Sequence, residues 1–201
     1  MTMLHQINHF GSKILQNGLK LSATSAATRK SLWGYVDIAF NQVDSNRLQE
    51  VGSDRLCAEW LIKNGGAIRT VDLPNRSFQN YNALPREDDH FKIKMVDATN
   101  SSIMKIGLEH FKGCHHIDTV IIHQCKHLES DGLEGLRYLK NTLKVLQVSG
   151  CDNITDEDLM VIGELAKLEL LKIVQMRYVK DLKKVEKNLK AKLPNCVMEI
   201  K

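Results

Sequence analysis

Apolar residues recur in a fixed pattern along the second half of the chain. The pattern is L-x-x-L-x-V followed by x-x-C-x-x-I, and copies of it begin at Ile117, Leu143 and Leu168. These starting points lie 26 and 25 residues apart, and the first two copies place a cysteine, Cys125 or Cys151, at the same position. Self-similarity at such a period is typical of a solenoid built from repeated units.

Weaker copies of the pattern flank these three. Extending it back by another 26 residues reaches Phe91, with Val96 in the strand and Thr99 at the cysteine position. A degenerate earlier copy begins at Ile68, and a final one begins at Leu193. These two copies are expected to mark the ends of the array.

Each copy has the pattern of a strand, a turn and a helix. Burial alternates with period two at the start of a copy, whereas residues 156–166 place apolar residues at helical spacing. The sequence therefore predicts an α/β fold, namely a leucine-rich-repeat solenoid of the cysteine-containing type with about four repeats in residues 67–201. Val120, Leu146 and Leu171 are expected to lie abreast on neighbouring parallel strands.

Residues 31–66 predict a short helical cap over the N-terminal end of the array. Gly52 breaks a helix, Ser53 is suited to begin the next, and Trp60 lies on its apolar face. The Asn-Gly-Gly run at 64–66 supplies a C-terminal stop. A cap is expected because a stacked repeat buries only the faces that it shares with its neighbours.

The basic residues at the start of the chain change how its overall charge is understood. Residues 1–30 contain Lys13, Lys20, Arg29 and Lys30 and no acidic residue, with many Ser, Thr and Ala. This composition predicts a mitochondrial transit peptide, and a disordered cytosolic tail is the alternative. Without these four cations the chain has 28 − 4 = 24 basic and 24 acidic residues, so the overall basicity gives little support for nucleic-acid binding.

Other motifs restrict the class of protein further. The chain has five cysteines, an odd number, and no C-x-x-C pair, which is typical of reduced thiols and not of a disulfide scaffold. No phosphate-binding loop, H-E-x-x-H or G-x-S-x-G motif occurs. We therefore expect a protein that is not an enzyme.

One cluster of cysteines and histidines has the composition of a zinc site. Zinc is bound by thiolates and imidazoles, but the repeat register places these residues at opposite ends of one unit. Packing within the repeat is therefore the favoured interpretation. The cluster consists of Cys114, His115, His116, His123, Cys125 and His127.

The exposed face of the sheet is the better candidate for function. The x positions of L-x-x-L-x-L point away from the core and align across the strands in two columns. These columns are more apolar than a solvated face requires, and such surface usually marks a contact site; cover by loops or by the N-terminal segment is the alternative. The first column is Ile93, Thr119, Val145 and Leu170, and the second is Met95, Ile121, Gln147 and Lys172.

The last predicted helix is rich in lysine, and Cys196, Met198 and Ile200 then alternate as a closing edge strand. A solvated helix face explains the lysines, and contact with anionic lipid or with an acidic subunit is the alternative. The lysines are Lys180, Lys183, Lys184, Lys187, Lys190 and Lys192.

Several short segments together resemble the family of mitochondrial ATP synthase coupling factor B, also called subunit s. The resemblance runs from about residue 33 to the end, and its most specific part is the N-terminal block, which generic leucine-rich repeats lack. The segments are Trp33-Gly34, residues 40–44, Val51-Gly52-Ser53-Asp54-Arg55, Glu59-Trp60-Leu61, Tyr81-Asn82, Val96-Asp97-Ala98-Thr99, residues 103–107 and Asn153-Ile154-Thr155-Asp156.

The resemblance implies a protein on the matrix side of the mitochondrial inner membrane that binds the membrane sector of ATP synthase and supports coupling. It also implies a magnesium ion held weakly by the backbone carbonyls of Gly65 and Thr99, a chemically reasonable choice because Mg²⁺ takes oxygen ligands. Two thiols one residue apart are implied after the strand at 117–122, but this chain has His123 and Cys125 there.

Two other functions remain open at this point. Relatives of the family suggest an assembly factor for the membrane arm of respiratory complex I. Cysteine-containing repeats also occur in substrate receptors of ubiquitin ligases, although the N-terminal helical box of those receptors is not found in residues 31–66.

Overall fold

The computed structural model describes residues 35–201, which form an α/β fold around one six-stranded mixed sheet. Residues 1–30, the predicted transit peptide, lie outside the described residues. The strands are β1 (Ala67–Thr70), β2 (Ile93–Asp97), β3 (Thr119–His123), β4 (Val145–Ser149), β5 (Leu170–Val174) and β6 (Val197–Ile200). The helices are α3 (Ser45–Lys63), η1 (Tyr81–Ala83), η2 (Lys105–Phe111), η3 (Glu134–Leu139), α4 (Asp156–Met160), η4 (Val161–Glu164) and α5 (Leu182–Lys192).

The strands lie side by side in the order in which they occur in the sequence. β1 pairs antiparallel with β2, and every later pair is parallel. Val120 pairs with Leu146 and Leu146 with Leu171, which confirms the expected alignment. All three side chains are fully buried, so one hydrophobic core runs beneath the whole sheet.

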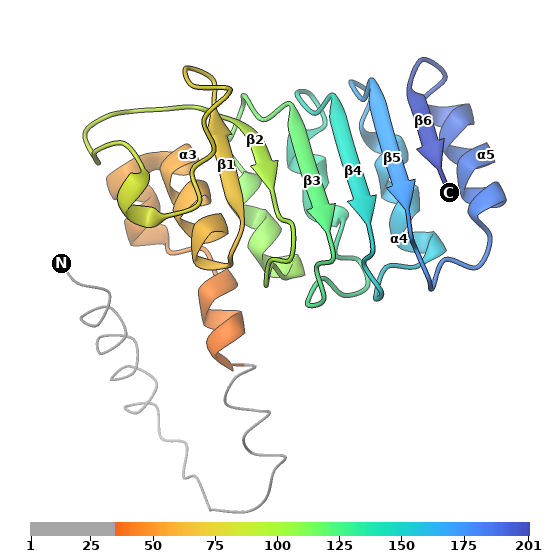
Figure 1. Cartoon of the computed structure of the whole chain (residues 1–201), viewed down its shortest axis with the longest axis horizontal. Helices are drawn as coiled ribbons and strands as arrows, with labels where there is room; N and C mark the ends of the chain where they lie inside the picture. The colour runs from red at the N-terminus through yellow and green to blue at the C-terminus, as the bar shows by residue number, and fades with distance from the viewer. Residues whose placement is uncertain (1–34) are drawn as a thin grey trace, which may run out of the picture. The chain divides into compact units, whose positions relative to one another are not determined.

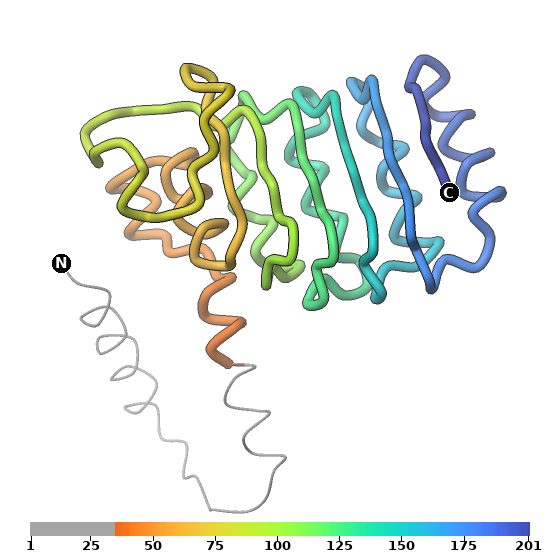
Figure 2. The backbone as a smooth tube through the Cα atoms, viewed as in Figure 1, coloured from red at the N-terminus to blue at the C-terminus, as the bar shows by residue number. Residues whose placement is uncertain are grey.

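The helical segments lie on one face of the sheet, and within residues 35–201 the other face carries no helix (Figure 1). Figure 1 shows η2, η3, α4 and α5 behind strands β2 to β6. Figure 2 shows the path that produces this layering, in which each strand is followed by a turn, a helical return and the next strand. None of the described helices is both long and apolar enough to cross a bilayer.

The segments that lead from the end of one strand back to the start of the next, here called returns, differ from the α-helices that the spacing predicts. η2 and η3 are 3₁₀-helices of 7 and 6 residues, and the next return combines α4 with η4. A 3₁₀-helix rises about 2.0 Å per residue against 1.5 Å for an α-helix. A short return can therefore span a strand's length with fewer residues.

Strands β2 to β5 are each followed by a similar turn. One residue of the turn adopts a left-handed conformation, and its N–H donates to a carbonyl at or just after the end of the next strand. The turn residues are Asn100, Gln124, Gly150 and Gln175, with φ of 55°, 53°, 61° and 58°. Their acceptors are the carbonyls of His123, Ser149, Val174 and Lys201, at 2.8, 2.9, 3.2 and 3.3 Å.

The register of β2 differs from the prediction by two residues. Met95 pairs with Thr119, so Ile93 and not Phe91 occupies the position of Ile117. Ser101 then takes the cysteine position assigned to Thr99, and its hydroxyl lies 3.5 Å from the thiol of Cys125. The sequence pattern was ambiguous here because Phe91 and Ile93 are both apolar and both buried.

Residues 35–41 are helical, and helix α3 follows them and contacts β1, β2 and η2. The predicted break is present at Gly52, whose φ of 77° and ψ of 171° are not helical. Asp44 caps its first turn, since its side chain accepts from the N–H groups of Asn46 and Arg47. The indole of Trp60 is 2% exposed and stacks on His110, with the ring centroids 4.8 Å apart.

A buried asparagine joins the segment before α3 to the first return. Asn41 is fully buried, and its side-chain oxygen accepts from Trp60 Nε1 at 3.1 Å and from the N–H of Met104 at 2.9 Å. Its amide nitrogen donates to Asn64 Oδ1 and to the Ser102 carbonyl, both at 3.2 Å. These bonds hold three segments that are distant in sequence against one another.

Candidate functional site

The face of the sheet without helices carries two rows of side chains that cross the parallel strands. Each row contains one residue per strand, in the pairing that the backbone hydrogen bonds set. The apolar row is Met95, Thr119, Val145, Leu170 and Val197. The polar row is Asp97, Ile121, Gln147, Lys172 and Glu199.

Seven of the eight residues expected on this face do lie on it. Ile93 was placed there wrongly, because it takes the position equivalent to Ile117, which faces the core, and it is fully buried. Met95 takes its place beside Thr119. Leu170 is 41% exposed, so the apolar row is open to solvent at its C-terminal end.

Val197 extends the apolar row and was missed by the sequence analysis. It pairs with Leu170 and is 67% exposed. The alternation of Cys196, Met198 and Ile200 was assigned to a closing strand, and the residue between the first two must then point outward. That signal was present in the sequence.

Charged residues around the rows largely neutralise one another across neighbouring strands. Exposed ion pairs of this kind contribute little binding or folding energy and leave no strong net field. The uncompensated feature of the face is therefore its apolar row. The pairs are Lys94–Asp118 at 4.0 Å, Lys144–Glu169 at 3.0 Å and Lys172–Glu199 at 3.5 Å.

The two carbonyls expected to hold magnesium belong to adjacent segments. The carbonyl of Asn64 accepts from the N–H of Ser102 at 2.8 Å, which ties the turn containing Gly65 to the turn containing Thr99. Within residues 35–201, no donor is bonded to the carbonyl of either Gly65 or Thr99. The oxygens are thus available for a hard cation, but they supply only two of the six ligands that Mg²⁺ takes.

The thiol of Cys125 lies beneath the sheet, not on its surface. It is fully buried and donates to the carbonyl of Ala98 at 2.8 Å. The neighbouring Cys151 thiol, followed by burial, raises the pKa of Cys125. Since the thiolate is the reactive form, this environment makes Cys125 a poor nucleophile.

The histidines and cysteines considered for zinc are spread over the fold. His115 and His116 are exposed before β3, whereas His123 ends that strand and its Nδ1 lies 2.8 Å from the Ser149 hydroxyl. In the described part of the chain, no three His, Cys, Asp or Glu side chains gather as a metal site would require.

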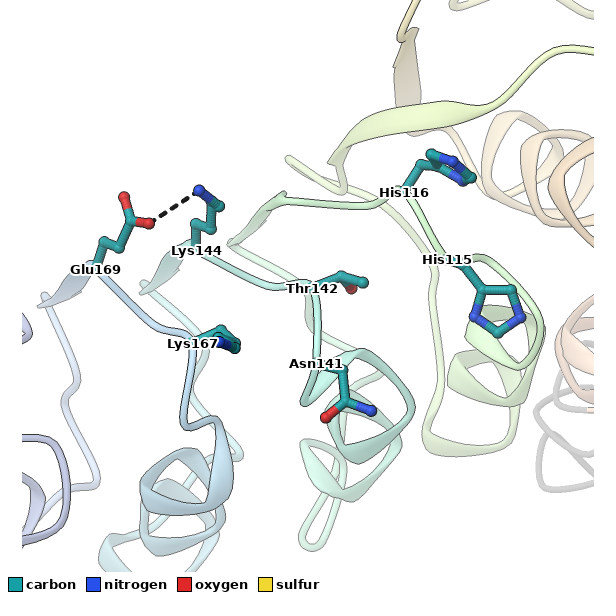
Figure 3. Close-up of a pocket in the computed structure, with 7 residues that line it drawn as sticks. All are labelled: His115, His116, Asn141, Thr142, Lys144, Lys167 and Glu169. Carbon is teal, nitrogen blue, oxygen red and sulfur yellow. Dashed lines mark ion pairs between the residues drawn. The ribbon is translucent and has the colours of Figure 1, made fainter.

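A shallow groove of about 420 Å³ lies where three returns lead back into the sheet. Figure 3 shows its lining, with Lys144 paired to Glu169 at 3.0 Å. The Thr142 hydroxyl donates to the Leu139 carbonyl at 3.4 Å, so no base activates it. The groove therefore adds no candidate nucleophile. Its lining is His115, His116, Asn141, Thr142, Lys144, Lys167 and Glu169.

Comparison with known proteins identifies the family. No family model matches the chain. The chain is 32% identical to human "ATP synthase subunit s, mitochondrial" over 172 residues, covering 84% of this chain and 86% of the relative. It is also 32% identical to the bovine protein of the same name over 187 residues, covering 91% and 92%. The chain belongs to the mitochondrial ATP synthase subunit s family.

Membership of the subunit s family confirms the resemblance found in the sequence. The mouse subunit s is likewise 32% identical over 172 residues. Two of the quoted segments coincide with structural features of this chain, since Trp60 and Asp54 are buried and hydrogen-bonded. In this chain, these two residues fix the junction of α3 with η2 and the sheet.

Proposed function

We propose that this chain is a non-catalytic coupling subunit of mitochondrial ATP synthase that binds the membrane sector from the matrix side. The single observation that carries the proposal is its membership of the subunit s family. The relatives are named as subunits of the mitochondrial ATP synthase, and the alignments extend over most of both chains.

The face of the sheet opposite the helices supplies the contact surface in this proposal. Its apolar row crosses five parallel strands, and the C-terminal end of the row is exposed at Leu170 and Val197. Interface cores are depleted in charge and built on apolar side chains. The ion pairs that flank the row would form the polar rim.

We further propose that the repeated units are cysteine-containing leucine-rich repeats stacked as a solenoid. Successive parallel strands with returns on one face support this interpretation, as do the buried Cys125 and Cys151 at equivalent positions. In such an array each unit contacts only its neighbours. A long rigid face would then be presented to a partner.

The carbonyls of Gly65 and Thr99 would hold a magnesium ion in this proposal, with water completing its coordination. Such a site binds weakly because two neutral oxygens replace only part of the hydration shell that Mg²⁺ retains. Its effect would be to fix the two turns at the N-terminal end of the sheet. Magnesium protection of the amides in these turns from hydrogen exchange would test it.

Residues 1–30 would direct the chain into mitochondria. Their basic, Ser/Thr/Ala-rich composition without acidic residues supports this role. A tagged full-length chain should therefore be found in mitochondria, peripheral to the inner membrane. A cytosolic location would contradict the proposal.

Depletion in cells tests the function directly. Mitochondria lacking the chain should show increased proton leak and lower ATP synthesis, and the chain should co-migrate with ATP synthase on native gels. Unchanged respiratory coupling would count against the proposal. Loss of complex I with intact ATP synthase would instead indicate a complex I assembly factor.

A further inference from the structure

The charge of the described chain is divided between its C-terminal end and the rest. Residues 177–201 contain 8 basic and 3 acidic residues, a net charge of 8 − 3 = +5. Residues 31–176 contain 16 basic and 21 acidic residues, a net charge of 16 − 21 = −5. The near neutrality of residues 31–201 therefore conceals a strongly basic end.

Helix α5 presents most of these cations to solvent. Val185 and Leu189 are fully buried and fix the face that packs on the core. At 100° per residue, Lys183, Lys184 and Lys187 then lie on the opposite face, and all three are exposed. Figure 1 places α5 beside β6 as the final helix of the array.

These three lysines differ from the lysines of the sheet face in having no acidic partner within residues 35–201. Lys94, Lys144 and Lys172 each pair with a carboxylate in the neighbouring strand or immediately before it. At the basic end, by contrast, the described residues provide no ion-pair partner for five side chains. These are Arg177, Lys180, Lys183, Lys184 and Lys187.

An exposed aromatic residue lies within the basic segment. Tyr178 is 61% exposed, between Arg177 and the buried Val179. The segment is held in place, since the Asp156 carboxylate accepts from the N–H groups of Lys180 and Asp181, both at 2.8 Å. A tyrosine with an apolar ring and a polar tip is suited to the boundary between lipid and water.

We propose that the basic end, formed by residues 177–180 and the outer face of α5, binds the surface of an anionic phospholipid bilayer. Clustered lysines without acidic partners gain free energy near a negatively charged lipid surface. Tyr178 would insert its ring among the headgroups, and the buried Val185 and Leu189 would stay in the core. The lipid contact would orient the sheet face for the proposed ATP synthase interaction, on which this inference rests.

Co-sedimentation of the full chain with vesicles tests the proposal. We expect binding to vesicles of equal parts phosphatidylglycerol and phosphatidylcholine, release by high salt, and no binding to phosphatidylcholine alone. Each lysine contributes about a fivefold gain in the membrane partition coefficient. The partition coefficient of the triple variant Lys183→Gln, Lys184→Gln, Lys187→Gln should therefore fall on the order of 100-fold. A Tyr178→Trp variant should gain a blue-shifted fluorescence on binding.

A charge-matched variant provides the control. Lys112→Gln, Lys126→Gln, Lys140→Gln removes three exposed cations from earlier repeats and should bind within a few-fold of the original chain. Circular dichroism should show both triple variants to be folded. Failure of the original chain to bind anionic vesicles, or equal losses in the two triple variants, would overturn the proposal.

The assay separates this inference from the proposed function because the vesicles contain no ATP synthase. Loss of vesicle binding with retained co-migration on native gels would reject the lipid surface alone. Vesicle binding without co-migration would reject the ATP synthase role alone. If α5 instead binds an acidic protein, the chain should fail to bind anionic vesicles, and the lipid proposal would be rejected.

Discussion

At the scale of single residues, two buried polar side chains fix the N-terminal end of the fold. Asn41 uses both its acceptor and its donors inside the protein. His110 is stacked on Trp60 and directs Nδ1 to the Gly107 carbonyl at 2.8 Å. A buried polar group that loses its hydrogen-bond partner destabilises the fold. Substitutions at these two residues should therefore lower the free energy of unfolding.

Replacement of Asn41 by alanine should destabilise the protein markedly. The indole N–H of Trp60 and the N–H of Met104 would lose their acceptor in a buried environment. We expect a loss of about 2–4 kcal/mol in the free energy of unfolding, measured with urea. Asn188→Ala, at an exposed position of α5, should change it by less than about 0.5 kcal/mol.

His110 should make stability depend on pH. Burial lowers its pKa to about 4, below the value of about 6.5 expected in the unfolded chain. As pH falls below 6.5 the unfolded state takes up the proton first, so stability should decrease by about 2 kcal/mol between pH 7 and pH 5. Urea unfolding of His110→Gln should show a smaller dependence of stability on pH than the original chain.

At the scale of elements, the returns pack so closely that glycine is required between two of them. A Cβ added to Gly135 in η3 would overlap Cβ of Leu108 in η2. Leu108 is fully buried and cannot move aside without disturbing the core. Adjacent 3₁₀ returns therefore constrain one another through backbone contact as well as through side chains.

Gly135→Ala should destabilise the array. Overpacking of this kind costs about 1–3 kcal/mol, which thermal or urea unfolding would detect. Gly163→Ala is the matched control in η4, because its Cβ would meet only the flexible chain of Lys192. Equal effects at the two positions would show that the tight contact between η2 and η3 does not limit stability.

At the scale of the whole molecule, the described residues cover one face of the sheet with helices and leave the other face without any (Figure 1). The open face carries the apolar row, and the C-terminal end carries the excess positive charge. Two surfaces with different chemistry therefore lie on one six-stranded fold. Their separation allows each to be altered without affecting the other.

Leu170→Glu together with Val197→Glu should abolish association with ATP synthase while leaving stability nearly unchanged. Both side chains are exposed on the sheet face, so the substitutions place charge on the C-terminal end of the proposed interface and not in the core of the fold. Co-purification from mitochondria measures the loss. Ile106→Glu, at a 37% exposed position of η2 on the helical face, should retain association.

Much of this fold is determined by the sequence itself. The spacing of Ile117, Leu143 and Leu168 sets three parallel strands in register, because only that alignment buries Val120, Leu146 and Leu171 together. The break at Gly52 also follows from local chemistry. The segments that carry the family resemblance could also be recognised from the sequence, because they combine turn residues with buried polar residues.

Other features were decided only by tertiary structure. The register of β2 depends on its pairing with β1 and β3, since Phe91 and Ile93 are equally apolar in sequence. The 3₁₀ form of the returns is set by the length that each must span. The partners of Asn41 come from segments up to 63 residues away in sequence, and no local pattern encodes contacts that exist only after the chain has folded.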